Sequence, residues 1–268
     1  MEKKLLKRSL TFAMMIAVVF STIIASSLIK ANAAETEKAV TLIQGEKTSQ
    51  YDTVQEAVAA VSADKTQAVI TLNKDFEGAG AVVKKDQNIV FNLNGFTWTI
   101  NSLVGSSGTE TNGVQLLQGS TVTIENGTLT SKTASKLIQN YCDLTIRNAT
   151  LSGQDNLTEI IVSNNNGSTV ITGNSTVQAA AGGIAFDSDK WGGYQGGNVT
   201  LEDGQVIGNV NATNGGKISL NGGTVTGDVI ASNYTYQGNE KTPANIVIDG
   251  ATINGNVTAQ NVGNISIS

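Results

Sequence analysis

Apolar residues recur along this chain in an eight-residue unit. The unit reads apolar, any, apolar, any, any, small, Thr, apolar, and the small residue is usually Gly, Ala or Ser. Its complete copies span residues 91–98, 122–129, 144–151, 170–177, 199–206, 218–225 and 246–253. The steps between copies range from 19 to 31 residues, and a truncated copy starts at Ile265. A minimum period with variable insertions predicts stacked coils joined by loops of different length.

Each unit contains two short strands separated by a corner. Its fifth position holds Gly, Asn or Asp, residues that tolerate a positive φ, so we expect a left-handed residue there. The predicted corner residues are Gly95, Asn126, Asn148, Asn174, Asp203, Gly222 and Gly250. A third apolar patch follows every unit, for example at 160–162 and 184–186. Three strands per turn predict an all-β fold, a parallel β-helix of about eight coils, whereas a β-sandwich would need regular two-residue hairpin turns.

The ends of such a stack need covers, because an open coil exposes apolar interior and unpaired backbone groups. Thr53 to Glu56 has the pattern of a capping box, and apolar residues follow on one helical face. We therefore predict a helix over about 53–63, a strand over 68–72, and an N-terminal cap over about 40–75. The last coil has no comparable cover, so we expect its edge either to pair with another copy or to be tolerated as a short polar strand.

Residues 1–33 have the features of a secretory signal peptide. A basic stretch precedes an apolar run over 10–28, and Ala31-Asn32-Ala33 supplies a small-x-small cleavage signal. We expect cleavage before Ala34, which leaves a single β-helix domain over 34–268. A retained membrane anchor is the alternative, which the serines in the apolar run disfavour. The predicted location is extracellular, with association to the cell surface left open.

The composition excludes several kinds of chemistry. The 268 residues include no histidine and a single cysteine, Cys142. Catalytic triads with histidine, His-ligated metals and disulfide frameworks are therefore excluded. Residues 1–33 hold five of the 17 bases and one of the 22 acids, so the remaining chain has a net charge of −9. An acidic chain whose only arginine beyond residue 33 is Arg147 is not expected to bind nucleic acid, and no membrane insertion is expected after cleavage.

Three segments resemble those of a known group of proteins. They are YDTVQEAV (51–58), VITLNKD (69–75) and NIVFNLNGFT (88–97). They look like the right-handed parallel β-helix, or pectin-lyase-like, group, in the form found in secreted surface proteins of Gram-positive bacteria. The resemblance covers nearly all of 40–268 and implies a right-handed solenoid. It implies little about function, because this fold hosts lyases, hydrolases, adhesins and carbohydrate-binding modules.

The enzymes of this group have motifs that can be compared with the chain. Pectate lyases use Ca²⁺ held by clustered Asp and an Arg base in an Arg-x-Pro-x-x-Arg setting, whereas Arg147 is followed by Asn148-Ala149-Thr150 and Pro243 lies elsewhere. Polygalacturonase-like hydrolases carry a Gly-His-Gly element, which a chain without histidine lacks. A lysine-based lyase stays open, and its candidate bases are Lys132, Lys136, Lys190 and Lys217.

Two insertions carry the candidate ligand-binding residues. The first follows the strand at 184–186 and combines carboxylates, an amine and aromatic rings among glycines; the second lies two coils later. Aromatic faces suit stacking on sugar rings, and the carboxylates can bind hydroxyls or help to ligate Ca²⁺. Both insertions leave the same corner, so we expect their rings about 10 Å apart, although shielding of a strand edge is the alternative. The candidates are Asp187, Asp189, Lys190, Trp191, Tyr194, Tyr234 and Tyr236.

These observations favour a secreted, non-catalytic β-helix that binds a polysaccharide or a cell-surface partner, as an adhesin or a carbohydrate-binding protein does. We name no catalytic residue and expect no cofactor other than Ca²⁺. A pectate-type polysaccharide lyase is the first alternative. The second is a structural surface or matrix protein that self-associates through its open C-terminal coil.

Paired threonines also suggest a flat face. They occur at Thr97/Thr99, Thr128/Thr130 and Thr224/Thr226, a pattern similar to ice-binding surfaces. Because Gln178, Gln205 and Ile207 interrupt the rows, ice binding is the weaker reading.

Overall fold

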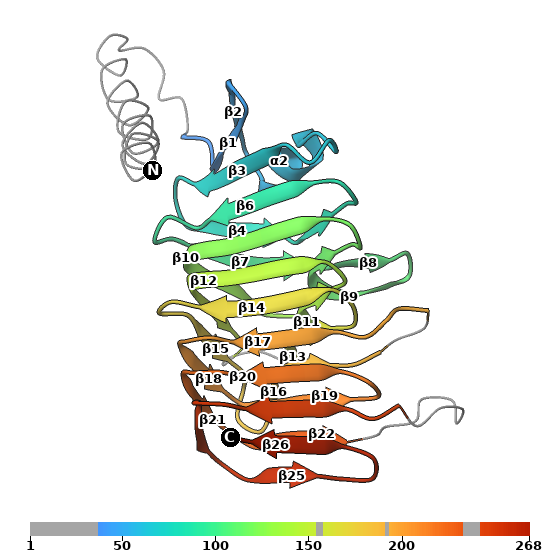
Figure 1. The fold of residues 1–268 in the computed structure, drawn as a ribbon. Coiled ribbons are helices and arrows are strands. Elements are labelled where there is room, and N and C mark those ends of the chain that lie inside the picture. The colour runs from blue at the N-terminus through green and yellow to red at the C-terminus, as the bar shows by residue number, and fades with distance from the viewer. Residues whose placement is uncertain (1–36, 154–157, 191–192, 233–241) are drawn as a thin grey trace, which may run out of the picture. The chain divides into compact units, whose positions relative to one another are not determined.

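The fold is a parallel β-helix, seen in a computed structural model that describes residues 37–153, 158–190, 193–232 and 242–268. The predicted signal peptide lies outside the described residues. Figure 1 shows the coils stacked along one axis, with α2 (Val54–Ala60) and the hairpin of β1 (Val40–Gln44) and β2 (Lys47–Tyr51) at one end. The strands β25 (Val257–Ala259) and β26 (Asn264–Ile267) lie at the other end. Each coil contributes one strand to each of three faces, which confirms the three-strand coil predicted from the repeat.

The first and second faces belong to one continuous sheet, because β10 (Thr121–Ser131) and β12 (Asp143–Ser152) bend across the corner between them. The other strands of the first face are β3 (Gln67–Leu72), β6 (Asn88–Asn92), β14 (Ser168–Thr172), β17 (Asn198–Leu201), β20 (Lys217–Leu220), β23 (Asn245–Ile248) and β26 (Asn264–Ile267). Those of the second face are β4 (Phe76–Ala79), β7 (Thr97–Ser102), β15 (Thr176–Gln178), β18 (Gln205–Ile207), β21 (Thr224–Thr226) and β24 (Thr252–Asn254).

The third face is a separate parallel sheet. Its strands are β5 (Ala81–Val83), β9 (Thr109–Leu116), β11 (Lys136–Asn140), β13 (Ile160–Asn164), β16 (Ile184–Ser188), β19 (Asn209–Thr213), β22 (Val229–Ser232) and β25 (Val257–Ala259). The short strand β8 (Val104–Ser106) pairs with β9 in antiparallel fashion. In the last coils Val257 is 39 % and Ile267 is 70 % exposed, and assembly through these strands stays a prediction.

The N-terminal cap contains the predicted helix. Helix α2 (Val54–Ala60) begins with a capping box, in which Thr53 Oγ1 accepts from Glu56 N at 3.1 Å and Glu56 Oε2 accepts from Thr53 N at 3.2 Å. Its apolar side packs on the first coil with Val54 fully buried. An antiparallel hairpin of β1 (Val40–Gln44) and β2 (Lys47–Tyr51), which the sequence reading did not include, extends the first face through β1 and β3.

The strands β3, β4 and β5 form a complete first coil that the repeat did not reveal. Register pairs Ile70 with Phe91 and Phe76 with Trp98. The turn from Leu72 to Phe76 is one residue shorter than the turn from Leu93 to Trp98, so the unit loses its spacing there. Eight complete coils result, in agreement with the predicted number, and β26 starts a further one.

The predicted corners are correct in four copies and displaced in three. Gly95, Asn126, Asn148 and Gly250 have a positive φ, as expected. At Asn174, Asp203 and Gly222 the prediction was wrong, because neighbouring glycines take the left-handed conformation, for which they have no steric cost. These glycines are Gly173, Gly204 and Gly223, with φ of 65°, 95° and 71°.

The copy at 170–177 is also shifted by one residue. Thr169 and Ile171 pair with Leu144 and Ile146, so they point inward instead of Val170 and Thr172. A buried Thr169 is tolerated because the interior beside it is polar: its hydroxyl lies 3.0 Å from Asn164 Oδ1 and from Asn140 Nδ2. Asn140 Nδ2 also donates to Asn164 Oδ1 at 2.6 Å, so the fully buried amides satisfy one another.

Cys142 lies beside this network as a small buried residue, as the sequence predicted. Its side chain is 3 % exposed, and burial raises the pKa of the thiol to about 12. A thiol with so high a pKa is not a nucleophile near neutral pH.

Tight corners separate the second and third faces in the coils of shortest period. A Cβ on Gly227 would lie 2.2 Å from Gly208 O, and one on Gly255 would lie 2.0 Å from Gly227 O. Only glycine fits where successive backbones approach so closely. This steric requirement accounts for the recurring Gly-Asn-Val and Gly-Asp-Val sequences, and in these coils it keeps this edge of the second face free of insertions.

Candidate functional site

The candidate site lies on the outer side of the third face, where two columns of side chains run across three coils. Gln139, Ser163 and Asp187 are in register in one column. Just beyond the strand ends, the residues that follow Asn140, Asn164 and Ser188 form the other. We call the group formed by Lys136, Gln139, Tyr141, Asn165, Asp187, Asp189 and Tyr194 the third-face site.

A chain of hydrogen bonds joins the two columns. Gln139 Nε2 donates to Asn165 Oδ1, and Asn165 Nδ2 donates to Asp189 Oδ1. Gln139 Nε2 also lies 3.2 Å from the carbonyl oxygen of Ser163. Because each amide donates toward the next coil, Asp189 accepts at the end of a chain that spans three coils.

The two carboxyl groups have unusually high pKa values. Burial raises the pKa of Asp187 to about 6, against a hydrogen bond from Thr213 Oγ1 at 3.3 Å and the charge of Lys136. Burial and the neighbouring charge of Asp187 raise the pKa of Asp189 to about 7, and Lys136 again acts in the opposite direction. One lysine therefore does not compensate two covered carboxylates.

A buried amide oxygen beside Asp187 is consistent with the raised pKa of this carboxyl group. Asn211 is the register neighbour of Asp187 on β19, and its Oδ1 has no hydrogen-bond partner within the part of the chain that the structure describes. A protonated carboxyl is a donor as well as an acceptor, so a neutral Asp187 would offer a hydrogen to this side of the column.

Tyr194 reaches back over the site from the insertion that follows β16. Its ring lies 4.8 Å from the ring of Tyr141, centroid to centroid, with an interplanar angle of 32°. The insertion is held at both ends: Gly197 N donates to Asp189 O at 3.0 Å, and Lys190 N donates to Asn214 O at 3.2 Å. The tyrosine therefore crosses two coil spacings, about 10 Å, from a fixed base.

The contact changes the electrostatics of Tyr141. Burial, followed by the neighbouring Tyr194 and Asp189, raises the pKa of the Tyr141 phenol. Tyr141 stays a neutral hydroxyl group at physiological pH, able both to donate and to accept a hydrogen bond.

A cavity of about 430 Å³ opens beside the tyrosine pair. Amide side chains dominate its lining, and Asn166 Nδ2 donates to Tyr141 O at 3.0 Å, which holds one wall in place. A cavity of this size is in the range of small-ligand sites. The residues that line it are Gln118, Asn166, Gly193, Tyr194 and Gln195.

The structure brings only some of the predicted site residues together. Asp187, Asp189 and Tyr194 meet at the third-face site, whereas Lys190 is held through its backbone at the side of coil six. Lys136 is the lysine whose charge acts on both carboxylates. The other predicted aromatics, Trp191, Tyr234 and Tyr236, lie outside the described residues, so the expected spacing between the two insertions stays a prediction.

Sequence reasoning missed Gln139, Tyr141 and Asn165 as members of the site, and it named Lys136 only as one of four candidate lyase bases. Lys136, Tyr141 and Asn165 lie up to two coils away from the insertion, and stacking alone brings them there. A signal was available, because Tyr141, Asn165 and Asp189 each lie one residue beyond the third strand of their coil.

Ca²⁺ binding by Asp187 and Asp189 stays a prediction. Among the described residues there is no group of three or more His, Cys, Asp or Glu side chains that could hold a metal ion. Ca²⁺ needs six to eight oxygen ligands, so amide and backbone oxygens would have to supply most of them. No helix among the described residues is long and apolar enough to cross a membrane.

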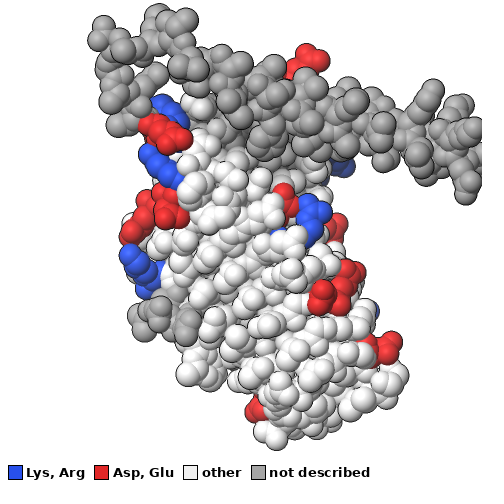
Figure 2. Space-filling model, turned by 90° about the vertical axis from the view of Figure 1, so that its left-hand side faces the viewer, with Lys and Arg blue, Asp and Glu red and all other residues white. Residues whose placement is uncertain are grey.

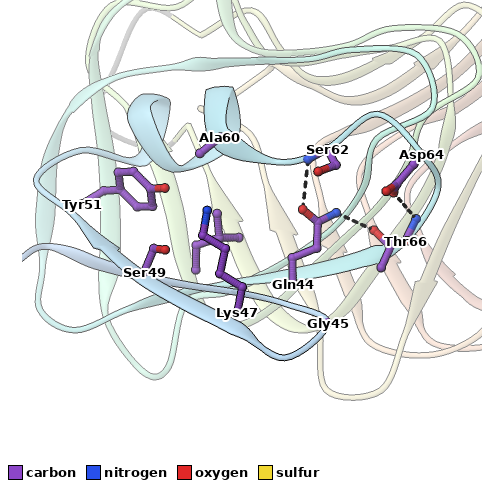
Figure 3. Close-up of a pocket in the computed structure, with 10 residues that line it drawn as sticks. Gln44, Gly45, Lys47, Ser49, Tyr51, Ala60, Ser62, Asp64 and Thr66 are labelled. Atoms are coloured by element: carbon purple, nitrogen blue, oxygen red, sulfur yellow. Dashed lines mark hydrogen bonds between the residues drawn. The ribbon is translucent and has the colours of Figure 1, made fainter.

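A smaller cavity of about 230 Å³ lies under the β1–β2 hairpin, shown in Figure 3. There Gln44 bridges the cap: its Oε1 accepts from Ser62 N at 3.0 Å and its Nε2 donates to Thr66 O at 3.0 Å. Thr66 N in turn donates to Asp64 Oδ1 at 2.8 Å. These groups bond to one another, so their evident role is to attach the hairpin and the helix to the first coil.

Comparisons with known proteins supply no relative. No protein-family model, no curated protein and no solved structure matches this chain.

Proposed function

We propose that this protein is a secreted, non-catalytic β-helix that binds a glycan at the third-face site. The observation that carries the proposal is the placement of Tyr194 against Tyr141 beside an amide-lined cavity. The leader-like residues 1–33 and the resemblance to secreted surface proteins favour an extracellular role, at the cell surface or in the medium.

The chemistry of the lining suits sugars. Phenol and amide groups each donate and accept hydrogen bonds, as sugar hydroxyls do, and an aromatic ring offers a flat apolar face to the C–H side of a sugar. Tyr194 is half-buried, and Gln118 and Gln195 are exposed around the cavity. The arrangement therefore combines one ring with several neutral polar groups.

The charge of the site selects among glycans. Above about pH 7, where Asp187 and Asp189 are ionised, two carboxylates are opposed by a single lysine, so a uronate would meet like charge. A neutral or amine-bearing sugar avoids this repulsion, and an amine would gain from it. We therefore expect neutral or amino sugars to bind and oligogalacturonate to bind poorly.

Titration calorimetry with soluble oligosaccharides tests this proposal. Cello-oligosaccharides, deacetylated chito-oligosaccharides and oligogalacturonate serve as probes for the wild type, Tyr194→Ala and the control Tyr51→Ala, a half-buried tyrosine in the cap. We expect Tyr194→Ala to weaken binding about fivefold, because a sugar-stacking ring contributes about 1 kcal/mol. Equal binding by both variants, or no binding of any probe, would contradict the proposal.

A lysine-based lyase is the second candidate, because the fold places Lys136 beside the two carboxylates. In a lyase this amine would abstract the proton next to a uronate carboxylate. Incubation with polygalacturonate and Ca²⁺, followed by the ultraviolet absorbance of an unsaturated product, distinguishes the two. Product that disappears in Lys136→Met would establish the lyase in place of the binding protein.

A further inference from the structure

The second face carries two continuous rows of outward side chains. Strand pairing aligns them from coil two to coil eight. One row is Thr97, Thr128, Thr150, Thr176, Gln205, Thr224 and Thr252; the other is Thr99, Thr130, Ser152, Gln178, Ile207, Thr226 and Asn254. We call these rows the threonine face.

No position of the threonine face bears a charge. Figure 2 looks onto this side of the molecule and shows a broad surface without acidic or basic residues, with charged residues gathered at its margins. Near one margin Lys132 pairs with Glu77 at 3.2 Å, so charge there is also partly neutralised. An electrically neutral face favours a neutral partner, since an ionic partner would lose hydration without gaining a counter-charge.

The rows also have a regular geometry. Neighbouring coils are about 4.8 Å apart, and outward residues two positions apart on a strand are about 6.6 Å apart. Parallel strands of only three residues, as in β15, β18 and β21, leave little room for twist to accumulate within a row. Apart from Ile207, the face is therefore a grid of hydroxyl and amide groups that extends over most of the solenoid.

We propose that the threonine face is a docking surface for a neutral, insoluble polysaccharide, in which extended chains present hydroxyl groups at regular intervals. Hydroxyl groups on both surfaces can donate and accept hydrogen bonds, and neither surface carries charge. Threonine suits this role because its β-branched side chain has few rotamers, so little conformational entropy is lost on binding. The inference does not depend on the third-face site, which lies on a different sheet.

Two other occupants fit the face less well. A second copy of the chain would bury hydroxyl groups against hydroxyl groups, whereas homodimer interfaces are more apolar than ordinary surface. Ice would need an unbroken array, which Gln178, Gln205 and Ile207 interrupt in the middle of the solenoid.

Pull-down on washed microcrystalline cellulose and on chitin particles tests the proposal. Thr128→Val/Thr150→Val removes two neighbouring hydroxyls and keeps the shape of the side chains. Thr123→Val/Thr145→Val makes the same change on the first face, at positions that are also paired and half-buried. We expect about tenfold weaker association for the first variant only, because each lost hydroxyl removes about one hydrogen bond.

The remaining arms separate this proposal from the others. Tyr194→Ala should pellet as the wild type does, which distinguishes the threonine face from the third-face site. Absence of wild-type binding to both particles, or equal binding by the two threonine variants, would overturn the proposal. It would also be overturned if Thr128→Val/Thr150→Val abolished either self-association in sedimentation velocity or inhibition of ice growth while particle binding persisted.

Discussion

The threonine face and the third-face site are both outer sides of parallel strands in the same coils, yet their polar groups behave differently. On the threonine face the side chains meet solvent, and tight glycine corners such as Gly227 exclude insertions beside it in the shortest coils. On the third face a loop returns its Tyr194 ring to Tyr141, and burial raises the pKa of the neighbouring Asp187 and Asp189. In this solenoid the length of the corner, more than the composition of the strand, decides whether a polar column is a solvated surface or a covered site.

The interior is apolar behind the threonine face and partly polar behind the third-face site. Behind the threonine face lie apolar residues such as Leu129 and Val177, both fully buried. Behind the third-face site, Asn140 and Asn164 are buried as a hydrogen-bonded pair. The strands of the third face have polar side chains on both their inner and their outer sides. They therefore depend on hydrogen bonds that the strands of the second face do not need.

The largest effect should come from breaking that interior pair. Asn164→Ala removes an acceptor from Asn140 Nδ2 and from Thr169 Oγ1, and it leaves both groups buried. We expect the free energy of unfolding to fall by about 3 kcal/mol. Denaturant unfolding followed by circular dichroism measures the loss. If Asn164→Ala were no more destabilising than Thr150→Ala on the threonine face, the contrast between the two interiors would be wrong.

The next effect concerns the covered carboxylates and depends on pH. The pKa of Asp189 rises from 3.8 to about 7 in the folded protein, so folding is favoured by protonation. The contribution of this group to stability is fully present below pH 3.8 and is lost as the pH rises through about 7. Asp189→Asn removes this loss. At pH 8 the free energy of unfolding of the variant should therefore exceed that of the wild type by about 2 kcal/mol, and at pH 4 it should not.

Thermal unfolding of both proteins across this pH range measures the difference. Asp249→Asn, the same replacement at an exposed carboxyl group, is the matched control. A gain for Asp189→Asn that is the same at pH 4 and pH 8 would show that the carboxyl is not covered as described.

The smallest effect should come from the threonine face. Thr128→Val/Thr150→Val exchanges two outward hydroxyls for methyl groups on half-exposed strand positions. We expect the free energy of unfolding to change by no more than about 0.5 kcal/mol, because surface substitutions away from special features are nearly neutral. A large loss of stability, measured by the same denaturant titration, would mean that these hydroxyls serve the fold, and the comparison of the two faces would have to be revised.

Much of the fold could be predicted from the sequence, because each coil of a solenoid repeats the same pattern of apolar and corner residues. The capping box at Thr53 and four of the corner residues were predictable from local chemistry alone. The first coil was not predictable, because its turn is one residue shorter and the repeat unit loses its spacing there. The inward position of Thr169 was not predictable either, because a buried threonine breaks the apolar pattern. The second error arises because an earlier coil, and not the local sequence alone, supplies a hydrogen-bond partner of Thr169.

The candidate site was predictable only in part. Asp187, Asp189 and Tyr194 lie in one insertion and could be singled out by their residue types. Tyr141 could not, and Lys136 was only one of four candidate bases, because each lies in an earlier coil and only the coil register brings it to the insertion.

The sequence by itself determined the architecture: repeated apolar positions, left-handed corners and a capping box specify a stack of parallel coils. It also determined the neutrality of the threonine face, since every side chain of its rows is uncharged. Only the tertiary structure decided which polar residues become a site. Stacking sets residues about 25 positions apart side by side, and burial in the folded protein raises the pKa of two carboxyl groups, Asp187 and Asp189.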